Sequence, residues 1–154
     1  MNLDEFKASQ KDHLYPSGTI FKSLIPNSPN KLPHYFVVLL TANAITQNRY
    51  VCACFTSQAG TVENISTSDS KRSLESFVEV DNSMFTIPFL RIEPSFIDCS
   101  IPFKQILSID YGTLVDTEPS VQLMTKLLTE TAKSKTLSQA IKSEIGRQIA
   151  LYST

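Results

Sequence analysis

Two apolar segments of strand length, separated by a short polar turn, constrain the fold more than any other part of the chain. The first reads Tyr-Phe-Val-Val-Leu-Leu-Thr-Ala over residues 35–42, and the second reads Arg-Tyr-Val-Cys-Ala-Cys-Phe-Thr over residues 49–56. Both segments are rich in β-branched and aromatic residues, which favour strands. The polar residues 43–49 have the length of a turn. We therefore predict that the two segments pair as an antiparallel hairpin.

Short apolar segments with frequent turn signals surround this hairpin. One precedes it after Ser17-Gly18, and a loop with three prolines over residues 26–33 follows that segment. Further strand-like segments lie downstream, at residues 76–81, 84–90, 94–103 and 105–110. Pro88, Pro94 and Pro102 are expected to mark sheet edges or bends in this region. Strands without a helical period between them are typical of a small barrel or a bent sheet. We predict an α+β, mainly β fold with a small, strongly bent antiparallel sheet of about five to seven strands.

Two polar regions flank the predicted strands. Residues 57–76 are rich in Ser, Thr, Asn, Asp and Lys and show no sustained apolar period. A loop of that length in a compact domain is usually functional or disordered. At the N-terminus, we expect a short helix around residues 3–11.

After Gly112, helical spacing replaces the alternating pattern. Pro119 marks the start of a first helix, whose apolar positions 121, 124 and 128 form one stripe. We predict that a second helix begins at Thr136, because Thr136 and Gln139 fit a capping box and every fourth residue from 137 to 149 is apolar. The chain is then a single domain, residues 1–154, with a β core at 17–115 and a helical tail at 117–152. The tail is expected to cover the sheet, and a partner-binding surface is the alternative.

The composition is that of an ordinary soluble globular protein. The chain has 154 residues, of which 42% are hydrophobic and 19% charged, enough for one core. No segment approaches the roughly 18 consecutive apolar residues that span a bilayer. The first residues lack the basic and apolar regions of a secretory signal, so we expect a cytoplasmic protein.

The three cysteines, Cys52, Cys54 and Cys99, are expected to be small buried thiols. Their odd number argues against a disulfide framework. A zinc knuckle needs a turn between its cysteines, whereas Cys52 and Cys54 are two apart on a predicted strand and share one face. We predict no metal site and no cofactor.

The small net charge of −1 hides an asymmetry along the chain. Residues 121–154 carry five basic and two acidic side chains, which leaves the preceding 120 residues with a charge of −4. Affinity for nucleic acid comes largely from phosphate contacts, so an acidic body is unusual for a general nucleic-acid binder. A nucleic acid would have to bind at a local basic patch.

The best candidate site lies at one end of the predicted hairpin. His34 stands just before the first strand, and Thr56 and Ser57 end the second, so antiparallel pairing brings the imidazole close to two hydroxyls. A histidine can act as acid or base near neutral pH, and hydroxyls can donate to phosphate oxygens. The structural alternatives are an imidazole bonded to a nearby carbonyl and a polar strand end that turns into a loop.

The order of several segments resembles the PemK/MazF-like growth-inhibitor toxins. These segments are Gly-Thr-Ile-Phe, Pro-His-Tyr-Phe-Val-Val-Leu, Phe-Thr-Ser-Gln and Pro-Ser-Phe-Ile-Asp-Cys, and the similarity covers roughly residues 17–115. The resemblance implies an SH3-like barrel followed by a helix. It also implies a metal-independent endoribonuclease that cleaves single-stranded RNA, acts as a dimer and is silenced by an antitoxin peptide.

Carried over residue by residue, the resemblance assigns roles to several side chains. The family's basic position before the second strand falls on His34, its hydroxyl position falls on Thr56 or Ser57, and a later polar position falls on Ser95. Many members have arginine where this chain has His34. The basic residues nearest to that position are Lys31, Lys22 and Arg49.

We therefore expect His34, Thr56 and Ser57 to be catalytic, and Ser95, Lys31 and Arg49 to bind substrate. A rival hypothesis is a non-catalytic SH3-like barrel that binds a peptide or protein partner. A third is a relative that has lost catalysis and keeps its antitoxin groove.

Overall fold

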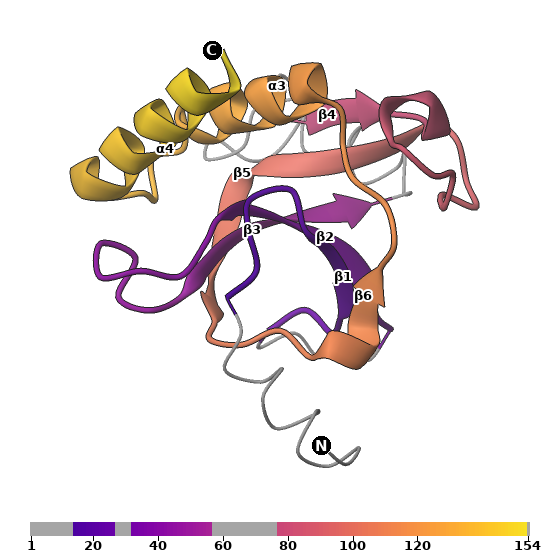
Figure 1. Cartoon of the computed structure of the whole chain (residues 1–154), viewed down its shortest axis with the longest axis horizontal. Coiled ribbons are helices and arrows are strands. Elements are labelled where there is room, and N and C mark those ends of the chain that lie inside the picture. Colours follow the sequence, from indigo (N-terminus) through magenta and orange to yellow (C-terminus); the bar gives the residue numbers. More distant parts are fainter. Residues whose placement is uncertain (1–13, 27–31, 57–76, 154) are drawn as a thin grey trace, which may run out of the picture.

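Six antiparallel strands form one strongly curved sheet, and two helices pack on one of its faces (Figure 1). The computed structural model describes residues 14–26, 32–56 and 77–153. In chain order the elements are β1 (Ile20–Ser23), β2 (His34–Leu40), β3 (Tyr50–Thr56), β4 (Phe77–Val80), the 3-10 turn η2 (Asn82–Met84), β5 (Ser95–Ile106), the 3-10 turn η3 (Tyr111–Thr113), β6 (Leu114–Val115), α3 (Val121–Thr131) and α4 (Gln139–Tyr152).

The strands are ordered β4-β5-β3-β2-β1-β6 across the sheet, and β1 and β6 curl away from the helices (Figure 1). The α+β, mainly β fold with a bent antiparallel sheet and two C-terminal helices is therefore confirmed. The sheet does not close into a barrel, because β4 and β6 lie at opposite ends of the strand order and do not pair with each other in the described part of the chain.

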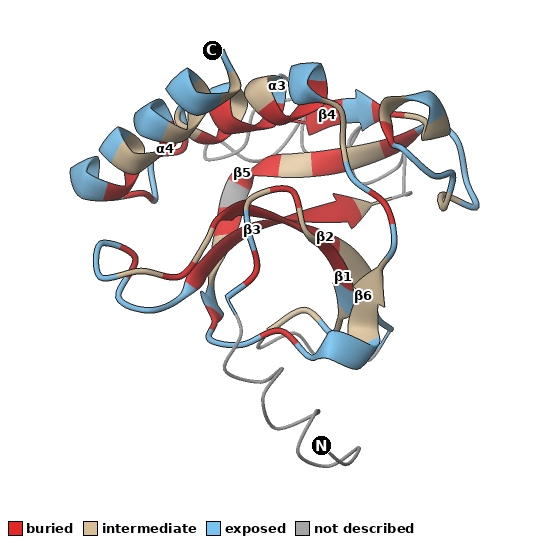
Figure 2. Cartoon of the chain, viewed as in Figure 1, coloured by how far each residue is buried: buried red, intermediate tan, exposed pale blue. Residues whose placement is uncertain are grey.

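The predicted hairpin of β2 and β3 forms the centre of the sheet, with Phe36 opposite Cys54 and Val38 opposite Cys52. Both strands are buried on both faces, as Figure 2 shows. Successive side chains on a strand point to opposite faces. Accordingly, Val37 and Leu39 belong to the core beneath the helices, whereas Phe36 and Val38 belong to a second core inside the curl of the sheet. A strand covered on both sides needs a continuous apolar run, which this hairpin has.

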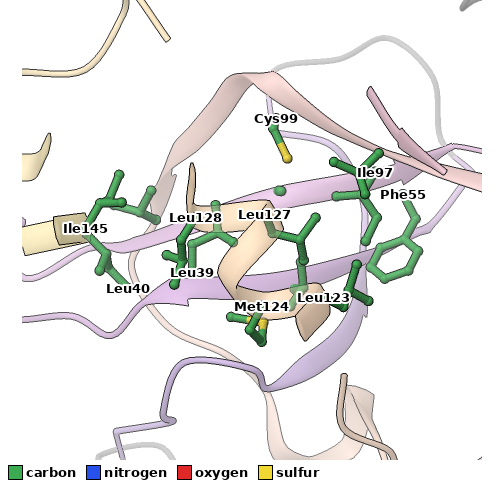
Figure 3. Packing of buried hydrophobic residues seen from close by; sticks show 14 of the residues in the cluster. Leu39, Leu40, Phe55, Ile97, Cys99, Leu123, Met124, Leu127, Leu128 and Ile145 are labelled. Carbon is green, nitrogen blue, oxygen red and sulfur yellow. The ribbon is translucent and has the colours of Figure 1, made fainter. Parts of the chain in front are cut away.

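The first core lies between the sheet and the two helices. Figure 3 shows Leu123, Leu127 and Leu128 of α3 packed among side chains of β2, β3 and β5, with Ile145 of α4 beside them. The polar sides of both helices face outward (Figure 2). The helical tail therefore covers the sheet, as expected. Neither helix, nor any other in the described residues, has the length and apolar character needed to cross a membrane.

The long strand β5 bends sharply where it pairs with β3. Cys54 is opposite Asp98, whereas Cys52, two residues away, is opposite Phe103. Several residues of β5 thus bulge out between these two pairs, and a bulge bends its strand. The bend contains Pro102, and β5 continues through it to Ile106. The separate strand expected at 105–110 is therefore not formed, because residues 105 and 106 end β5 and residues 107–110 lie outside any strand.

Residues 84–90 do not form the strand that the sequence predicts. Met84 ends η2, and residues 85–90 form an irregular loop with one described bridge, between Phe85 and Pro119. The backbone N–H groups of Phe89 and Leu90 donate to the side chain of Asn82 instead of to a neighbouring strand. Pro88 has no N–H to contribute to a ladder.

Both helices begin slightly later in the chain than the sequence predicts. The helix α3 begins at Val121 with Ser120 as its N-cap, two residues after the Pro119 expected to mark its start. The helix α4 begins at Gln139 rather than at Thr136, because the N-cap is Ser138, whose hydroxyl accepts from the backbone N–H of Ile141. The expected helix at 3–11 and the polar stretch 57–76 lie outside the described residues.

Truncation of the α3 side chain at the centre of the first core tests this packing. Leu127 is fully buried, so Leu127→Ala should lower the free energy of unfolding by about 2–5 kcal/mol through lost burial and a cavity. The matched control, Leu151→Ala, removes a side chain that is 67% exposed and should change the value by less than about 0.5 kcal/mol. Chemical denaturation of the two variants measures both changes, and equal effects would contradict the placement of α3.

Candidate functional site

The strand register brings His34 and Thr56 together at one end of the sheet. His34 pairs with Ser23 of β1, and Thr56 pairs with Phe96 of β5. Continuing the β2–β3 register by two residues beyond the Phe36–Cys54 pair places His34 opposite Thr56. Residues opposite each other on antiparallel strands have Cβ atoms about 5 Å apart. The two residues are therefore neighbours, as the hairpin predicts, and their catalytic role stays a prediction.

A pocket of about 300 Å³ opens at this end of the sheet. It lies between the start of β2, the end of β3 and the loop that leads into β5. Its lining consists of Lys22, Leu32, Pro33, His34, Tyr35, Phe55, Thr56, Leu90, Arg91, Ile92 and Ser95. We call it the basic pocket.

The ionisable groups of basic type that line the basic pocket are two cations and an imidazole. Lys22, Arg91 and His34 contribute, and no described carboxylate belongs to the lining. The Lys22 ammonium lies 5.3 Å from the centroid of the Tyr35 ring, a cation–π distance. Arg91 is exposed and carries a guanidinium that suits planar, bidentate recognition of phosphate. The pocket is therefore suited to an anion, within a chain whose first 120 residues are acidic overall.

The hydrogen bond of His34 indicates which ring nitrogen carries the proton when the ring is neutral. Nδ1 lies 3.0 Å from the carbonyl oxygen of Leu32. A carbonyl oxygen can only accept, so Nδ1 carries the proton. In the neutral ring, Nε2 is then the unprotonated nitrogen, able to take a proton from a ligand. The hydrogen bond to a nearby carbonyl, which is the structural alternative to a catalytic role for His34, is thus present. It leaves Nε2 able to act as a base.

Strand alternation divides the lining of the basic pocket between the two faces of the sheet. His34 and Thr56 share the face of Phe36, whereas Lys22, Tyr35 and Phe55 share the face that the helices cover. Both sets line one pocket because it lies at the ends of the strands. A ligand there meets the imidazole and the hydroxyl from one face, and the ammonium and aromatic rings from the other.

Ser95, predicted to bind substrate, lines the pocket and is 5% exposed. Its hydroxyl donates to the carbonyl oxygen of Ile92 at 2.7 Å. This bond closes the turn that leads into β5 and occupies the hydroxyl proton. Ser95 is therefore placed to hold the turn, with its oxygen as a remaining acceptor.

Among the other predicted site residues, Arg49 is described and does not line the pocket. Arg49 stands before β3, at the opposite end of that strand from Thr56, a separation of roughly 20 Å at the usual rise per residue. Ser57 and Lys31 lie outside the described residues. Arg49 is therefore unsuited to act on a ligand held at the basic pocket.

Arg91 is the pocket residue that sequence reasoning missed. It lies in the irregular loop before β5, far along the chain from His34, and reaches the pocket because β5 returns beside β3. One weak signal was available, since Arg91 is the single basic residue between positions 73 and 103. Lys22, the other exposed cation of the pocket, was one of the basic alternatives near His34.

The cysteines lie in the cores and not at the basic pocket. All three are free and buried, as expected. Burial raises the pKa of Cys99 to about 12, and burial together with the nearby Asp98 carboxylate raises that of Cys54 to about 12. Burial also raises the pKa of Cys52. Within residues 14–26, 32–56 and 77–153, no three His, Cys, Asp or Glu side chains group in a way that could hold a metal ion.

A comparison with protein-family models found no match, and comparisons with curated proteins and with solved structures found none either. The geometry and chemistry of the basic pocket therefore carry the functional argument.

The raised thiol pKa values predict inert cysteines in the native protein. The reactive species is the thiolate, so near pH 8 the folded chain should react very slowly with a thiol-specific disulfide reagent. After unfolding in guanidinium chloride, all three thiols should react at once. Thiols of the unfolded chain ionise above about pH 8.5, so these groups should lower the stability of the fold as the pH rises beyond that value. Rapid labelling without denaturant would contradict their burial.

Proposed function

We propose that the chain is a metal-independent endoribonuclease of the toxin type, which cleaves single-stranded RNA at the basic pocket in the cytoplasm. One observation carries the proposal: an imidazole whose Nδ1 is bonded to the Leu32 carbonyl lines a pocket together with two cations and a hydroxyl, and no described carboxylate lines it. A phosphodiester is an anion, and these are the groups that its transesterification requires.

The reaction proceeds by internal attack of the ribose. His34 takes the proton of the 2′-hydroxyl through Nε2, the 2′-oxygen bonds to phosphorus, and the bond from phosphorus to the 5′-oxygen breaks. The leaving oxygen takes a proton from the imidazolium or from water. The products are a 2′,3′-cyclic phosphate and a 5′-hydroxyl. Proton transfer by a positioned side chain contributes about 10²–10⁴-fold to such a rate.

Charge that develops on the phosphorane needs donors already in place. Arg91 and Lys22 supply cationic N–H groups, and the Thr56 hydroxyl adds a neutral one. A single preorganised donor of this kind is worth about 2.7–4 kcal/mol in the barrier. In this chain, Arg91 thus takes the clamp role that the toxin family gives to the arginine before its second strand.

A non-catalytic peptide-binding module is the second candidate. Apolar and aromatic side chains, among them Tyr35, Phe55 and Ile92, make up much of the lining, as expected for a pocket that takes an acidic peptide with an apolar anchor. The resemblance adds an antitoxin peptide and a second copy of the chain as proposed partners.

Replacement of His34 tests the nuclease. A fluorogenic single-stranded RNA should be cleaved by the native chain in the presence of a chelator, and a DNA of the same sequence should not, because it lacks the 2′-hydroxyl. The variants His34→Ala and His34→Gln should lower the rate about 10²–10⁴-fold, since neither side chain can accept the proton. The matched control, His13→Ala, changes the only other histidine and should retain the rate. Thermal melting verifies that each variant is folded.

The same experiment separates the two candidates. Intact RNA with the native chain, or equal rates for native chain and His34→Ala, would refute the nuclease. An acidic peptide that binds the native chain, and binds more weakly to His34→Ala, would then establish the peptide-binding module.

Arg91 and Arg49 form a matched pair for the binding step. Binding of a single-stranded RNA with 2′-O-methyl groups, which cannot be cleaved, should weaken about tenfold in Arg91→Ala, because a charge-assisted contact to phosphate is lost. The slope of log affinity against log salt should fall by about one. Arg49→Ala removes the same charge at the far end of β3 and should bind like the native chain. If Arg91→Ala and Arg49→Ala lose the same RNA affinity, binding depends on the overall charge of the chain and not on the basic pocket.

A further inference from the structure

Asn82 is joined by hydrogen bonds to the loop that carries Arg91. Its side-chain oxygen accepts from the backbone N–H groups of Phe89 and Leu90, each at 2.9 Å. Its side-chain amide donates to the carbonyl oxygen of Leu90 at 3.1 Å. Its own backbone N–H donates to the Glu93 carboxylate at 2.9 Å. These four bonds reach the chain on both sides of Arg91.

The position of Asn82 is itself well defined. It begins η2 and is separated from β4 by Asp81 alone. The Asp81 side chain caps this turn by accepting from the backbone N–H of Ser83 at 2.8 Å. The strand β4 pairs with β5, which begins just beyond the loop. Asn82 therefore connects the loop to the sheet at a point that the sheet holds in place.

From this geometry we propose that Asn82 is a positioning residue for the basic pocket, which holds the loop 89–93 so that Arg91 lines the pocket. The role of Arg91 toward RNA rests on the proposed function, whereas the hold on the loop does not. An amide is required at position 82. A carboxylate would keep the two acceptor bonds but would present an oxygen to the Leu90 carbonyl, and an alanine would leave the N–H groups of Phe89 and Leu90 without their acceptor.

A second tie on the same chain segment supplies a matched control. The Thr117 hydroxyl accepts from the backbone N–H of Ile87 at 3.0 Å and donates to the Ile87 carbonyl at 2.8 Å. Thr117→Ala therefore removes hydrogen bonds of similar kind from the same irregular segment, but before Pro88 and away from Arg91. General weakening of the segment should appear in both variants, and positioning of Arg91 only in Asn82→Ala.

Amide hydrogen exchange tests the hold on the loop without any ligand. In Asn82→Ala, the amide protons of Phe89 and Leu90 should exchange at least about tenfold faster than in the native chain. In Thr117→Ala, those two should keep their rates, and the amide proton of Ile87 should exchange faster. Unchanged rates at Phe89 and Leu90 in Asn82→Ala would overturn the proposal.

Binding of the 2′-O-methyl RNA tests the consequence for Arg91. Asn82→Ala should lose affinity about as much as Arg91→Ala, and the double variant should be no weaker than Arg91→Ala alone, because both changes remove one contact. If the fold-losses of affinity in the two single variants multiply in the double variant, Asn82 acts independently of Arg91, and the positioning role is overturned. If Arg91→Ala binds like the native chain, the clamp of the proposed function fails, and the exchange rates alone decide whether Asn82 fixes the loop.

Discussion

The burial of β2 and β3 on both faces is the constraint on which the rest of the structure depends. Side chains alternate between the faces, so a hairpin that is apolar throughout requires two cores. The helices α3 and α4 provide one, and the curl of the sheet toward β6 provides the other. The hydrophobic effect thus accounts for both the helical layer and the curvature. Polar residues are left to the strand ends, where the basic pocket opens.

Local patterns were sufficient for the elements whose neighbours are close in sequence. The hairpin followed from two apolar runs and a polar turn, and the helices from their apolar spacing. Sequence patterns do not decide between Thr136 and Ser138 as the N-cap of α4, because both are hydroxyl residues within one turn of each other. The prolines were informative in part, since Pro102 marks a bend that the bulge of β5 absorbs without ending the strand.

The parts that sequence reasoning missed depend on contacts between distant residues. The apolar run at 84–90 has the composition of a strand, but the Asn82 side chain takes the N–H groups that a ladder would use. Arg91 lines the same pocket as His34 because β5 pairs with β3. The His34–Thr56 neighbourhood was predictable because one hairpin contains both residues, whereas Arg91 required the whole strand order.

Among the described strands, the two that end the sheet differ in what they offer to another polypeptide. In the described part of the chain, β6 has two residues and leaves almost no backbone for an added strand. The other end, β4, has four residues, and Glu79 at its centre is exposed. A charge on an edge strand discourages self-association, because like charges would meet when two copies pair. A polypeptide that extends this sheet at β4 is therefore favoured if it brings a lysine or an arginine opposite Glu79.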